Sequence, residues 1–504
     1  MIKFTFLYRA QFLKFGLISG VLVGLSYCFT FLGPLAYVGF IPLFHSWMKS
    51  KPKQNMLSGY IFGLAYNLIS NYWIASNSGA PKEIALLSLI LAVLYLSTFW
   101  AFAGFIVGYY NSKQNVFIML PFLLVCLEWV RSFGPLGFAW GNISLTQIFF
   151  LPLLQHIDIG GTYIVTFWIV SINTLIYVHF FIKKLTVKKQ TFVFCLVILY
   201  ILSGWWKMNS YEPINYSNTI NVAIIQPNID PNKKWNKISR KRTHQVMDSL
   251  HSEAIKLNPD IILFPETALP TYIRLNKKVR DLLQNRVDSS RIPILIGTVD
   301  RRFSPEGGKN FFNSSIYFQP GKNISVYDKI HLVPFAEYDL VPEVLHPLIN
   351  LNINIDRGVF RGGNEYKIFN LDSIKFSGLI CYESSFPRYA RKLSNMGANF
   401  LMIQANDGWL GKSRGPYQHF NHSILRAIEN RIAIARSSNT GISGVLLPNG
   451  KVARKIALNE KSVFNYNIPF DKSRSFYSCF GDVFATICFI IFLFIGPVAS
   501  CVKL

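Results

Sequence analysis

The chain has 504 residues, of which 51% are hydrophobic, 15% are aromatic and only 15% are charged. Soluble globular domains carry about 25% charged residues, so this composition excludes an ordinary soluble protein and predicts a membrane protein. The formal net charge of +25 suits basic loops at a membrane surface and anionic lipid headgroups. Nucleic-acid binding would use the same charge, but no helix-turn-helix, zinc or RNA-binding signature accompanies it.

The first 210 residues form a series of hydrophobic segments with short connections. A helix needs about 20 apolar residues to cross a membrane. The candidate spans are 15–30, 33–48, 56–76, 84–110, 115–133, 157–181 and 190–206, with one more at 483–501. We therefore predict a transmembrane domain at 1–210 and a C-terminal transmembrane helix at 483–504, with about eight crossings in total.

Lysine and arginine residues cluster on alternate connections between these spans. Examples are Lys3 and Arg9 before the first span, Lys49 after the second and Lys183 after the sixth. Basic loops stay in the cytoplasm, so we expect a cytoplasmic N-terminus and an extracytoplasmic polar region at 219–470. The first span lacks a small-x-small cleavage site, so we interpret it as a retained helix rather than a signal peptide.

Two ionisable residues and a tryptophan stand out near the fifth span. Glu128 and Arg131 are three residues apart, a spacing that lets them pair on a helix. Arg131 is otherwise expected to extend to the membrane surface. Trp140 suits an anchor at the membrane–water interface.

Between 219 and 470 the pattern changes to alternating strands and helices. The predicted strands are 222–226, 260–265, 293–299, 312–319, 324–329, 375–381, 399–405 and 432–438, and a hairpin is expected around Pro448-Asn-Gly450. The predicted helices are 237–257, 277–288, 386–396 and 417–431. This alternation indicates a layered α/β domain.

Among the seven cysteines, Cys381 is the only one well inside the polar region, so a disulfide framework there is not expected. It ends an apolar strand, at the edge where α/β enzymes place their chemistry. A single cysteine is more often buried and inert.

Two partners strengthen the catalytic interpretation. Glu266 follows the strand 260–265, and Lys329 ends the strand 324–329. Each alone fits a solvated loop residue. A nucleophile, a carboxylate base and a cation at three strand ends form the pattern of an activated-nucleophile site.

The motifs around these residues extend over most of the chain. They are Phe264-Pro-Glu-Thr-Ala-Leu-Pro270, Lys329-Ile-His-Leu-Val-Pro-Phe-Ala-Glu-Tyr338, Ile380-Cys-Tyr-Glu383, Gln226-Pro-Asn228, Asn406-Asp-Gly-Trp409 and Ser438-Asn-Thr-Gly441. The chain resembles the nitrilase (carbon–nitrogen hydrolase) superfamily, and within it the apolipoprotein N-acyltransferase branch. Ala336, Asp339 and Gly408 depart from that branch's pattern and affect only expected loop geometry.

The resemblance implies an αββα nitrilase sandwich and assigns roles to the site residues. Cys381 would be the nucleophile, Glu266 the base and Lys329 a donor to the oxyanion, together with the backbone N–H of Tyr382. Glu337 and Glu383 would support Lys329 and its loop. Trp235 and Tyr382 would shape the pocket, and Trp140 would lie near the substrate entrance. No cofactor is implied.

The implied reaction is two-step acyl transfer. Cys381 would take an acyl chain from a phospholipid such as phosphatidylethanolamine, and the α-amine of a lipoprotein's diacylglyceryl-cysteine would then accept it. The implied location is the bacterial cytoplasmic (inner) membrane with a periplasmic catalytic domain, and a monomer is favoured.

An apolar segment follows the Lys329 motif. Residues 340–355 carry almost no charge, and Leu345 and Leu348 lie within them. The ordinary interpretation is a buried loop. We favour an apolar lid that admits acyl chains, with Leu345 and Leu348 contacting substrate.

Three alternatives remain open from the residues alone. His419 and His422 lie three apart near Asp407, but no further ligand pattern supports a metal, and we predict none. A membrane-tethered amidase would use the same three residues with water as acceptor, although a tether needs only one span. A scaffold with a decayed site would be expected to lack one of the three.

Overall fold

The computed structural model describes residues 11–110, 116–211, 218–303, 308–334, 336–338, 360–470 and 474–501. The chain divides into two compact units. The first contains Met1–Glu212, Lys412–Gly415 and Ser475–Leu504, and the second contains Pro213–Gly411 and Pro416–Arg474.

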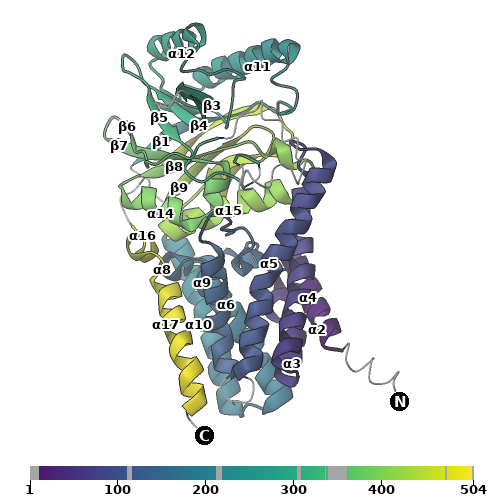
Figure 1. Ribbon diagram of the computed structural model, residues 1–504. Coiled ribbons are helices and arrows are strands. Elements are labelled where there is room, and N and C mark those ends of the chain that lie inside the picture. The colour runs from purple at the N-terminus through teal and green to yellow at the C-terminus, as the bar shows by residue number, and fades with distance from the viewer. Residues whose placement is uncertain are drawn as a thin grey trace. The chain divides into compact units, whose positions relative to one another are not determined.

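The first unit is a bundle of helices (Figure 1). Its described α-helices are α2 (Gln11–Cys28), α3 (Ile41–Lys49), α4 (Pro52–Asn71), α5 (Lys82–Tyr110), α6 (Val116–Arg131), α7 (Leu151–Leu154), α8 (Ile157–Gly160), α9 (Tyr163–Tyr177), α10 (Val187–Ser210), α16 (Phe476–Phe480) and α17 (Val483–Cys501). Short 3₁₀ and π segments are η1 (Thr30–Tyr37), η2 (Tyr72–Ser76), η3 (Ile143–Gln147) and η4 (Val178–Ile182).

Several of these helices have the length and composition of membrane spans. Among the described residues, five segments qualify: Gln11–Cys28, Thr30–Lys49, Lys82–Tyr110, Tyr163–Phe181 and Val187–Ser210. Helix α6 has only 16 residues and α4 includes several polar side chains, so the predicted number of spans is approximate. The unit is a multi-pass helical membrane domain.

Glycines allow the first helices to pack closely. A Cβ atom on Gly20 of α2 would overlap the carbonyl oxygen of Phe62 in α4, and one on Gly59 of α4 would overlap that of Trp100 in α5. Lipid supplies little hydrophobic drive for helix association, so close van der Waals contact at small residues has to stabilise the bundle.

Glu128 and Arg131 in α6 hold the loop that follows the helix. Glu128 accepts a hydrogen bond from the Ile143 backbone N–H at 2.6 Å, and Arg131 donates from Nη2 to the Gly141 carbonyl at 2.7 Å. The expectation that Arg131 reaches the membrane surface is wrong, because the residue is only 1% exposed. Each buried charge instead satisfies backbone groups of the loop.

Trp140 lies in the same loop and is also buried. Its ring packs against that of Trp73 with centroids 4.8 Å apart, and its carbonyl accepts a hydrogen bond from the Tyr27 hydroxyl. Because only 2% of the residue is exposed, the prediction of an interfacial anchor is wrong. Its predicted substrate contact stays a prediction.

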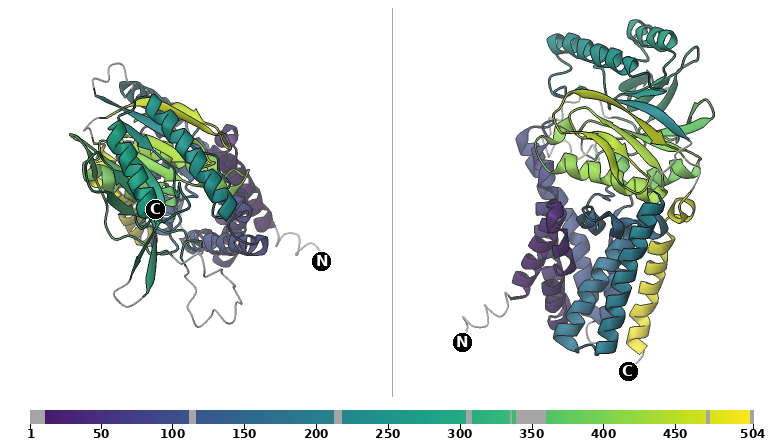
Figure 2. Two further views of the ribbon diagram at one scale, coloured as in Figure 1. Left: turned by 90° about the horizontal axis from the view of Figure 1, so that it is seen from above. Right: turned by 180° about the vertical axis from the view of Figure 1, so that it is seen from behind.

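The second unit stacks two sheets between two layers of helices (Figure 2). One sheet has the order β12-β1-β2-β3-β4-β5 and the other β11-β10-β9-β8-β7-β6. The strands are β1 (Thr219–Gln226), β2 (Ile261–Leu263), β3 (Ile294–Phe303), β4 (Lys309–Phe318), β5 (Ser325–Asp328), β6 (Phe369–Leu371), β7 (Ile374–Ile380), β8 (Phe400–Ala405), β9 (Ala433–Ser438), β10 (Ser443–Leu446), β11 (Val452–Ile456) and β12 (Ser462–Pro469). The helices are α11 (Lys237–Lys256), α12 (Lys277–Ser290), α14 (Pro387–Asn395) and α15 (Gly415–Asn430), with short 3₁₀ turns η7 (Cys381–Ser385) and η8 (Asp407–Leu410).

Alternation along the strands explains the αββα layering. In β1, Val222 and Ile224 enter the core between the two sheets, while Ala223 and Ile225 pack toward α11 and α12. Successive strand side chains point to opposite faces, so a strand buried on both faces is apolar throughout. The predicted sandwich is confirmed.

Two strands were not predicted. β6 has only three residues, too few for a periodic signal. β12 pairs antiparallel with β1, but its sequence interrupts apolar residues with asparagines, which are depleted in strands.

The strand directions bring the candidate residues together. β1, β2 and β3 are mutually parallel neighbours, as are β7, β8 and β9. Their carboxyl ends therefore lie at one edge of each sheet, where α/β folds place their sites.

Candidate active site

Cys381 is the first residue after β7 and opens the 3₁₀ turn η7. Its φ angle is +51°, a left-handed conformation that is uncommon for residues other than glycine. Such strain persists only where neighbouring contacts over-determine it, and it gathers at functional sites.

Glu266 lies in a turn just after β2 and is buried. The turn fits closely against β3, because a Cβ atom on Gly297 would overlap the Glu266 Cα. The next residue, Thr267, has a φ of +44°. Lys234 holds it there, with Nζ donating to the Thr267 carbonyl at 2.7 Å and to its Oγ1 at 2.8 Å.

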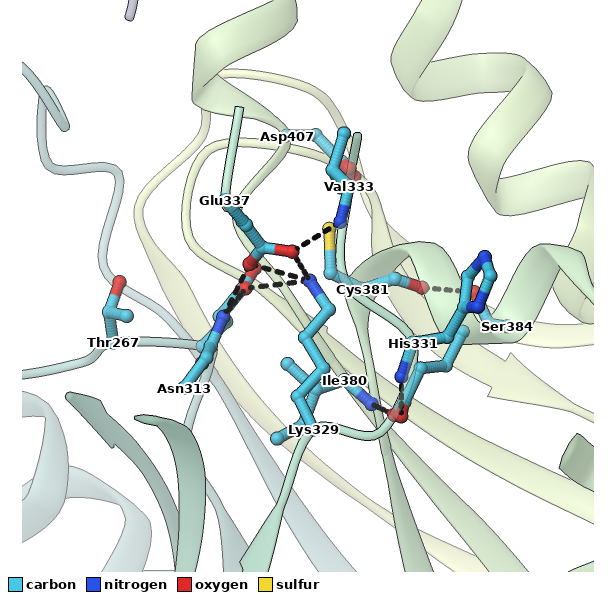
Figure 3. Close-up of polar contacts among 12 residues, drawn as sticks. Thr267, Asn313, Lys329, His331, Val333, Glu337, Ile380, Cys381, Ser384 and Asp407 are labelled. Carbon is cyan, nitrogen blue, oxygen red and sulfur yellow. Dashed lines mark hydrogen bonds and ion pairs between the residues drawn. The ribbon is translucent and has the colours of Figure 1, made fainter. Parts of the chain in front are cut away.

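Lys329 follows β5 and is only 1% exposed. Its Nζ lies 2.8 Å from the carboxylate of Glu337 (Figure 3). The same Nζ lies 3.9 Å from Glu266 Oε1. The Lys329 backbone N–H donates to the Asn313 carbonyl at 2.8 Å, which extends the pairing of β4 with β5 by one residue. The ammonium group is therefore placed between two carboxylates.

Asn313 joins the same two carboxylates and was missed by the sequence analysis. Its Nδ2 donates to Glu337 Oε1 at 3.0 Å (Figure 3). It also donates to Glu266 Oε1 at 2.7 Å. One amide nitrogen has two N–H donors, so it can serve both. The only sequence signal was a polar residue inside a predicted strand, which is too common to single out.

Glu337 and Glu383 have different surroundings. Besides Lys329 and Asn313, Glu337 accepts from the Val333 N–H at 2.7 Å. Glu383 accepts through Oε1 from the Ile330 N–H at 2.7 Å and through Oε2 from the Ile380 N–H at 2.8 Å. Glu337 therefore contacts the ammonium group directly, whereas Glu383 ties the loop after Lys329 to the end of β7.

Glu383 is fully buried, which leads to a stability prediction. Replacing it with glutamine is expected to lower the thermal midpoint of the purified protein by roughly 5–10 °C, because an amide NH₂ then faces backbone N–H donors. Differential scanning fluorimetry measures the shift, with the exposed Glu365→Gln as the matched control. An unchanged midpoint in both variants would contradict the assignment.

Burial and charge set the protonation of the three candidates. Burial raises the pKa of Glu266, while Lys329 and Asn313 partly oppose that rise. Burial lowers the pKa of Lys329, but the carboxylates of Glu337 and Glu266 outweigh it and the net shift is upward. Desolvation of the sulfur, with Glu266 next to it, raises the pKa of Cys381 well above its usual range. A neutral thiol thus faces a carboxylate made more basic by burial.

The remaining predicted residues divide between described and undescribed parts of the chain. Tyr382 is nearly buried, and its ring packs against His331 with centroids 5.6 Å apart. Trp235 lies next to Lys234 and is 37% exposed. Leu345 and Leu348, with the predicted lid 340–355, lie outside the described residues.

Asp407 and His419, which the sequence suggested as possible metal ligands, lie close to Cys381. One ligand atom from each of these three residues lies within 4.8 Å of the others. Asp407 is already paired with His419 at 2.5 Å and with Arg436 at 2.9 Å. Burial alone would raise the pKa of Asp407, but His419 and Arg436 together outweigh it and lower the pKa to about 2. The group is a buried ion-pair cluster that contacts the candidate nucleophile.

Comparison with known proteins covers both units. Residues 221–477 match the carbon–nitrogen hydrolase family model, and residues 19–175 match the model of the apolipoprotein N-acyltransferase N-terminal domain. The chain is 29% identical to an apolipoprotein N-acyltransferase of Geobacter metallireducens, with 94% of this chain and 92% of that protein covered. It is 31% identical to the protein of the same name from Rickettsia bellii, with 94% and 95% covered.

A solved structure of an amidase from Nesterenkonia sp. is also similar to part of the chain. It is 17% identical, with a TM-score of 0.38, and the match covers 51% of this chain and 93% of that one.

Proposed function

The chain belongs to the apolipoprotein N-acyltransferase family, and we propose that Cys381 carries the acyl group between its two substrates as a thioester. The enzyme transfers an acyl chain to the N-terminal amine of lipoproteins. The observation behind the thioester proposal is the arrangement around Cys381, where the charges of Glu266 and Lys329 both act on the buried thiol and lie 3.9 Å from each other.

The first half-reaction begins with proton transfer. Glu266 takes the proton of the Cys381 thiol, because a thiolate attacks carbonyls far faster than a thiol does. The thiolate adds to an ester carbonyl of the phospholipid. Lys329 and the backbone N–H of Tyr382 donate to the oxyanion that forms. Collapse of this intermediate releases the lysophospholipid alcohol, which takes the proton from Glu266, and leaves the acyl-thioester.

The second half-reaction uses the same groups in reverse. The α-amine of diacylglyceryl-cysteine attacks the thioester carbonyl and forms a second oxyanion at the same donors. Glu266 takes a proton from the attacking nitrogen, the C–S bond breaks, and the proton passes to the departing Cys381 sulfur. One site thus serves two lipid substrates in turn, which is covalent ping-pong catalysis.

The neighbouring polar residues keep this machinery ionised and aligned. Asn313 and Lys329 favour the ionised form of Glu266, and Glu337 fixes the position of the Lys329 ammonium. Glu383 holds the loop that carries Lys329. We assign pocket roles to Trp235 and Tyr382.

Further substrate contacts belong to this proposal as expectations from the sequence. They are Trp140, which lies in the membrane unit, and Leu345 and Leu348 in the predicted lid.

The setting of the reaction is a membrane. The chain is a multi-pass membrane protein that handles lipid and lipoprotein substrates. We propose that it lies in the bacterial cytoplasmic (inner) membrane as a monomer, with a cytoplasmic N-terminus and a periplasmic catalytic unit. The alternating basic loops support this orientation. The proposed donor is phosphatidylethanolamine.

The decisive test is the intact mass of the purified enzyme after incubation with phosphatidylethanolamine and no acceptor. We expect a hydroxylamine-labile gain of one acyl chain that is absent in Cys381→Ser. Addition of a diacylglyceryl-cysteine peptide should then discharge the enzyme and give an amide. If the enzyme forms no adduct with lipid but hydrolyses small amides, the acyltransferase mechanism is wrong and the tethered-amidase alternative holds.

The raised pKa of Glu266 predicts how the rate of acyl-enzyme formation falls at low pH, which is the acidic limb of the pH–rate profile. Below that pKa Glu266 is protonated and cannot accept the thiol proton, so the rate of acyl-enzyme formation falls as the pH drops. The limb is expected above pH ~4.3, the ordinary value for glutamate. Asn313→Ala should move the limb to higher pH, because the lost hydrogen bond favoured the ionised form. A limb that stays in place in this variant would contradict the role given to Asn313.

A further inference from the structure

The backbone carbonyl of Cys381 receives two hydrogen bonds from outside the strand. The Ser384 hydroxyl donates to it at 2.7 Å, and His419 Nε2 lies 3.0 Å away. These bonds fall on the one residue of η7 with a positive φ angle. They are contacts of the kind that a left-handed cysteine needs in order to persist.

His419 is held through both ring nitrogens. Nδ1 lies 2.5 Å from Asp407 Oδ1, and because an ionised carboxylate only accepts, Nδ1 donates to it. Nε2 lies 3.0 Å from the Cys381 carbonyl and 3.0 Å from the Ser384 hydroxyl, which itself donates to that carbonyl at 2.7 Å. The ring, the hydroxyl and the Cys381 carbonyl therefore form one hydrogen-bonded group.

Two groups, Asp407 and Arg436, lie within hydrogen-bond distance of His419 Nδ1. Arg436 Nη2 is 3.0 Å from His419 Nδ1 and 2.9 Å from Asp407 Oδ2. Nδ1 cannot both donate to Asp407 and accept from Arg436. The shorter contact with the carboxylate decides the matter, and Arg436 donates to the second carboxylate oxygen.

One face of α15 carries both residues that hold η7. Arg426 lies seven residues after His419, which is two helical turns, and its Nη1 donates to the Ser385 carbonyl at 2.9 Å. Arg426 is in turn paired with Glu429 at 2.7 Å. The helix thus binds the carbonyls at both ends of the turn that opens with Cys381.

We propose that His419 is a positioning residue for the nucleophile: held by Asp407, its ring locks the Cys381 backbone in the left-handed conformation that directs the thiol toward Glu266 and Lys329. The inference rests on the proposed function, in which Cys381 is the nucleophile. His419 does not contact the reacting atoms. Without its hydrogen bond, the strained turn relaxes and the sulfur leaves its aligned position.

The test compares His419→Leu with His419→Gln in the full-length, detergent-solubilised enzyme. Leucine removes the donor, whereas the glutamine side chain can present an N–H near the position of Nε2. His244→Gln, on the distant helix α11, is the matched control. Two rates are measured: acyl-enzyme formation with phosphatidylethanolamine, and alkylation of the Cys381-containing peptide by iodoacetamide, followed by mass spectrometry.

We expect His419→Leu to slow acyl-enzyme formation by roughly 10²-fold, the size of effect that a misplacement of about 1 Å produces. The KM for phospholipid should stay within about twofold of wild type, because a positioning residue acts on the bound state. His419→Gln should recover most of the rate, and the thermal midpoint of both variants should remain within a few degrees of wild type.

Other outcomes overturn the proposal. A His419→Leu enzyme with the wild-type rate excludes a positioning role. If His419→Leu loses both rate and a large part of its thermal midpoint, and His419→Gln does not restore the rate, His419 contributes to stability alone. If wild-type enzyme forms no acyl adduct on Cys381, the proposed function fails by itself, and the alkylation rates still report whether His419 positions the thiol.

Discussion

Replacing Cys381 with alanine is expected to lower the rate of acyl transfer to a diacylglyceryl-cysteine peptide by roughly 10⁴-fold or more, to the background rate. The reason is that no other group in the described site can form the covalent intermediate. Glu266 is a base without its proton donor, and Lys329 stabilises an oxyanion that no longer forms. Product is measured by mass spectrometry of the peptide.

The chain offers matched controls for this variant. Cys195 and Cys479 are exposed and free, and neither belongs to the site. Cys195→Ala and Cys479→Ala should transfer acyl chains at the wild-type rate. Substantial turnover by Cys381→Ala would remove this cysteine from the mechanism, whatever its conformation.

Replacing Lys329 with methionine is expected to reduce the rate of acyl-enzyme formation by about 10² to 10³-fold, the usual effect of removing an oxyanion donor. Two consequences add up. The oxyanion loses a charge-assisted donor, and the carboxylates of Glu266 and Glu337 lose the cation between them. The pKa of Glu266 should then rise further, because Lys329 is the main group that lowers it. The acidic limb of the rate is therefore expected to move to higher pH.

Lys322→Met is the control for charge and hydrophobicity, because Lys322 is exposed in the same unit. It should leave both the rate and the acidic limb unchanged. If Lys329→Met lowers the rate without moving the acidic limb of the pH–rate profile, Lys329 has no electrostatic effect on Glu266. That result would contradict the interaction inferred from the 3.9 Å distance between them.

Much of the fold was predictable because it depends on local patterns. Long apolar runs must be helical in a membrane, since every backbone polar group has to be satisfied within the segment. In the second unit, apolar runs between turn residues marked most of the strands. The failures were β6, with three residues, and β12, whose asparagines hide a strand that becomes regular only by pairing with β1.

Charged residues in the membrane unit show where local pattern misleads. Spacing along α6 suggested that Glu128 and Arg131 would pair or reach the surface. In the structure both are buried and interact electrostatically, and they also hydrogen-bond the Ile143 N–H and the Gly141 carbonyl of the following loop. Sequence spacing describes a helix in isolation, whereas a buried charge binds whichever polar groups the tertiary structure brings within about 3 Å.

Composition and local pattern were enough to predict a multi-pass membrane protein with an α/β unit and to select Glu266, Lys329 and Cys381 as candidates at three strand ends. The surroundings of these residues became known only from the folded chain. Asn313 bridges two carboxylates and His419 bonds the Cys381 carbonyl, although nothing near either residue in sequence indicates this. The physical reason is the distance along the chain over which each kind of signal acts. Hydrophobic periodicity repeats along the chain and can be recognised locally, whereas a hydrogen bond depends on a few tenths of an ångström between residues that strand order and helix packing bring together.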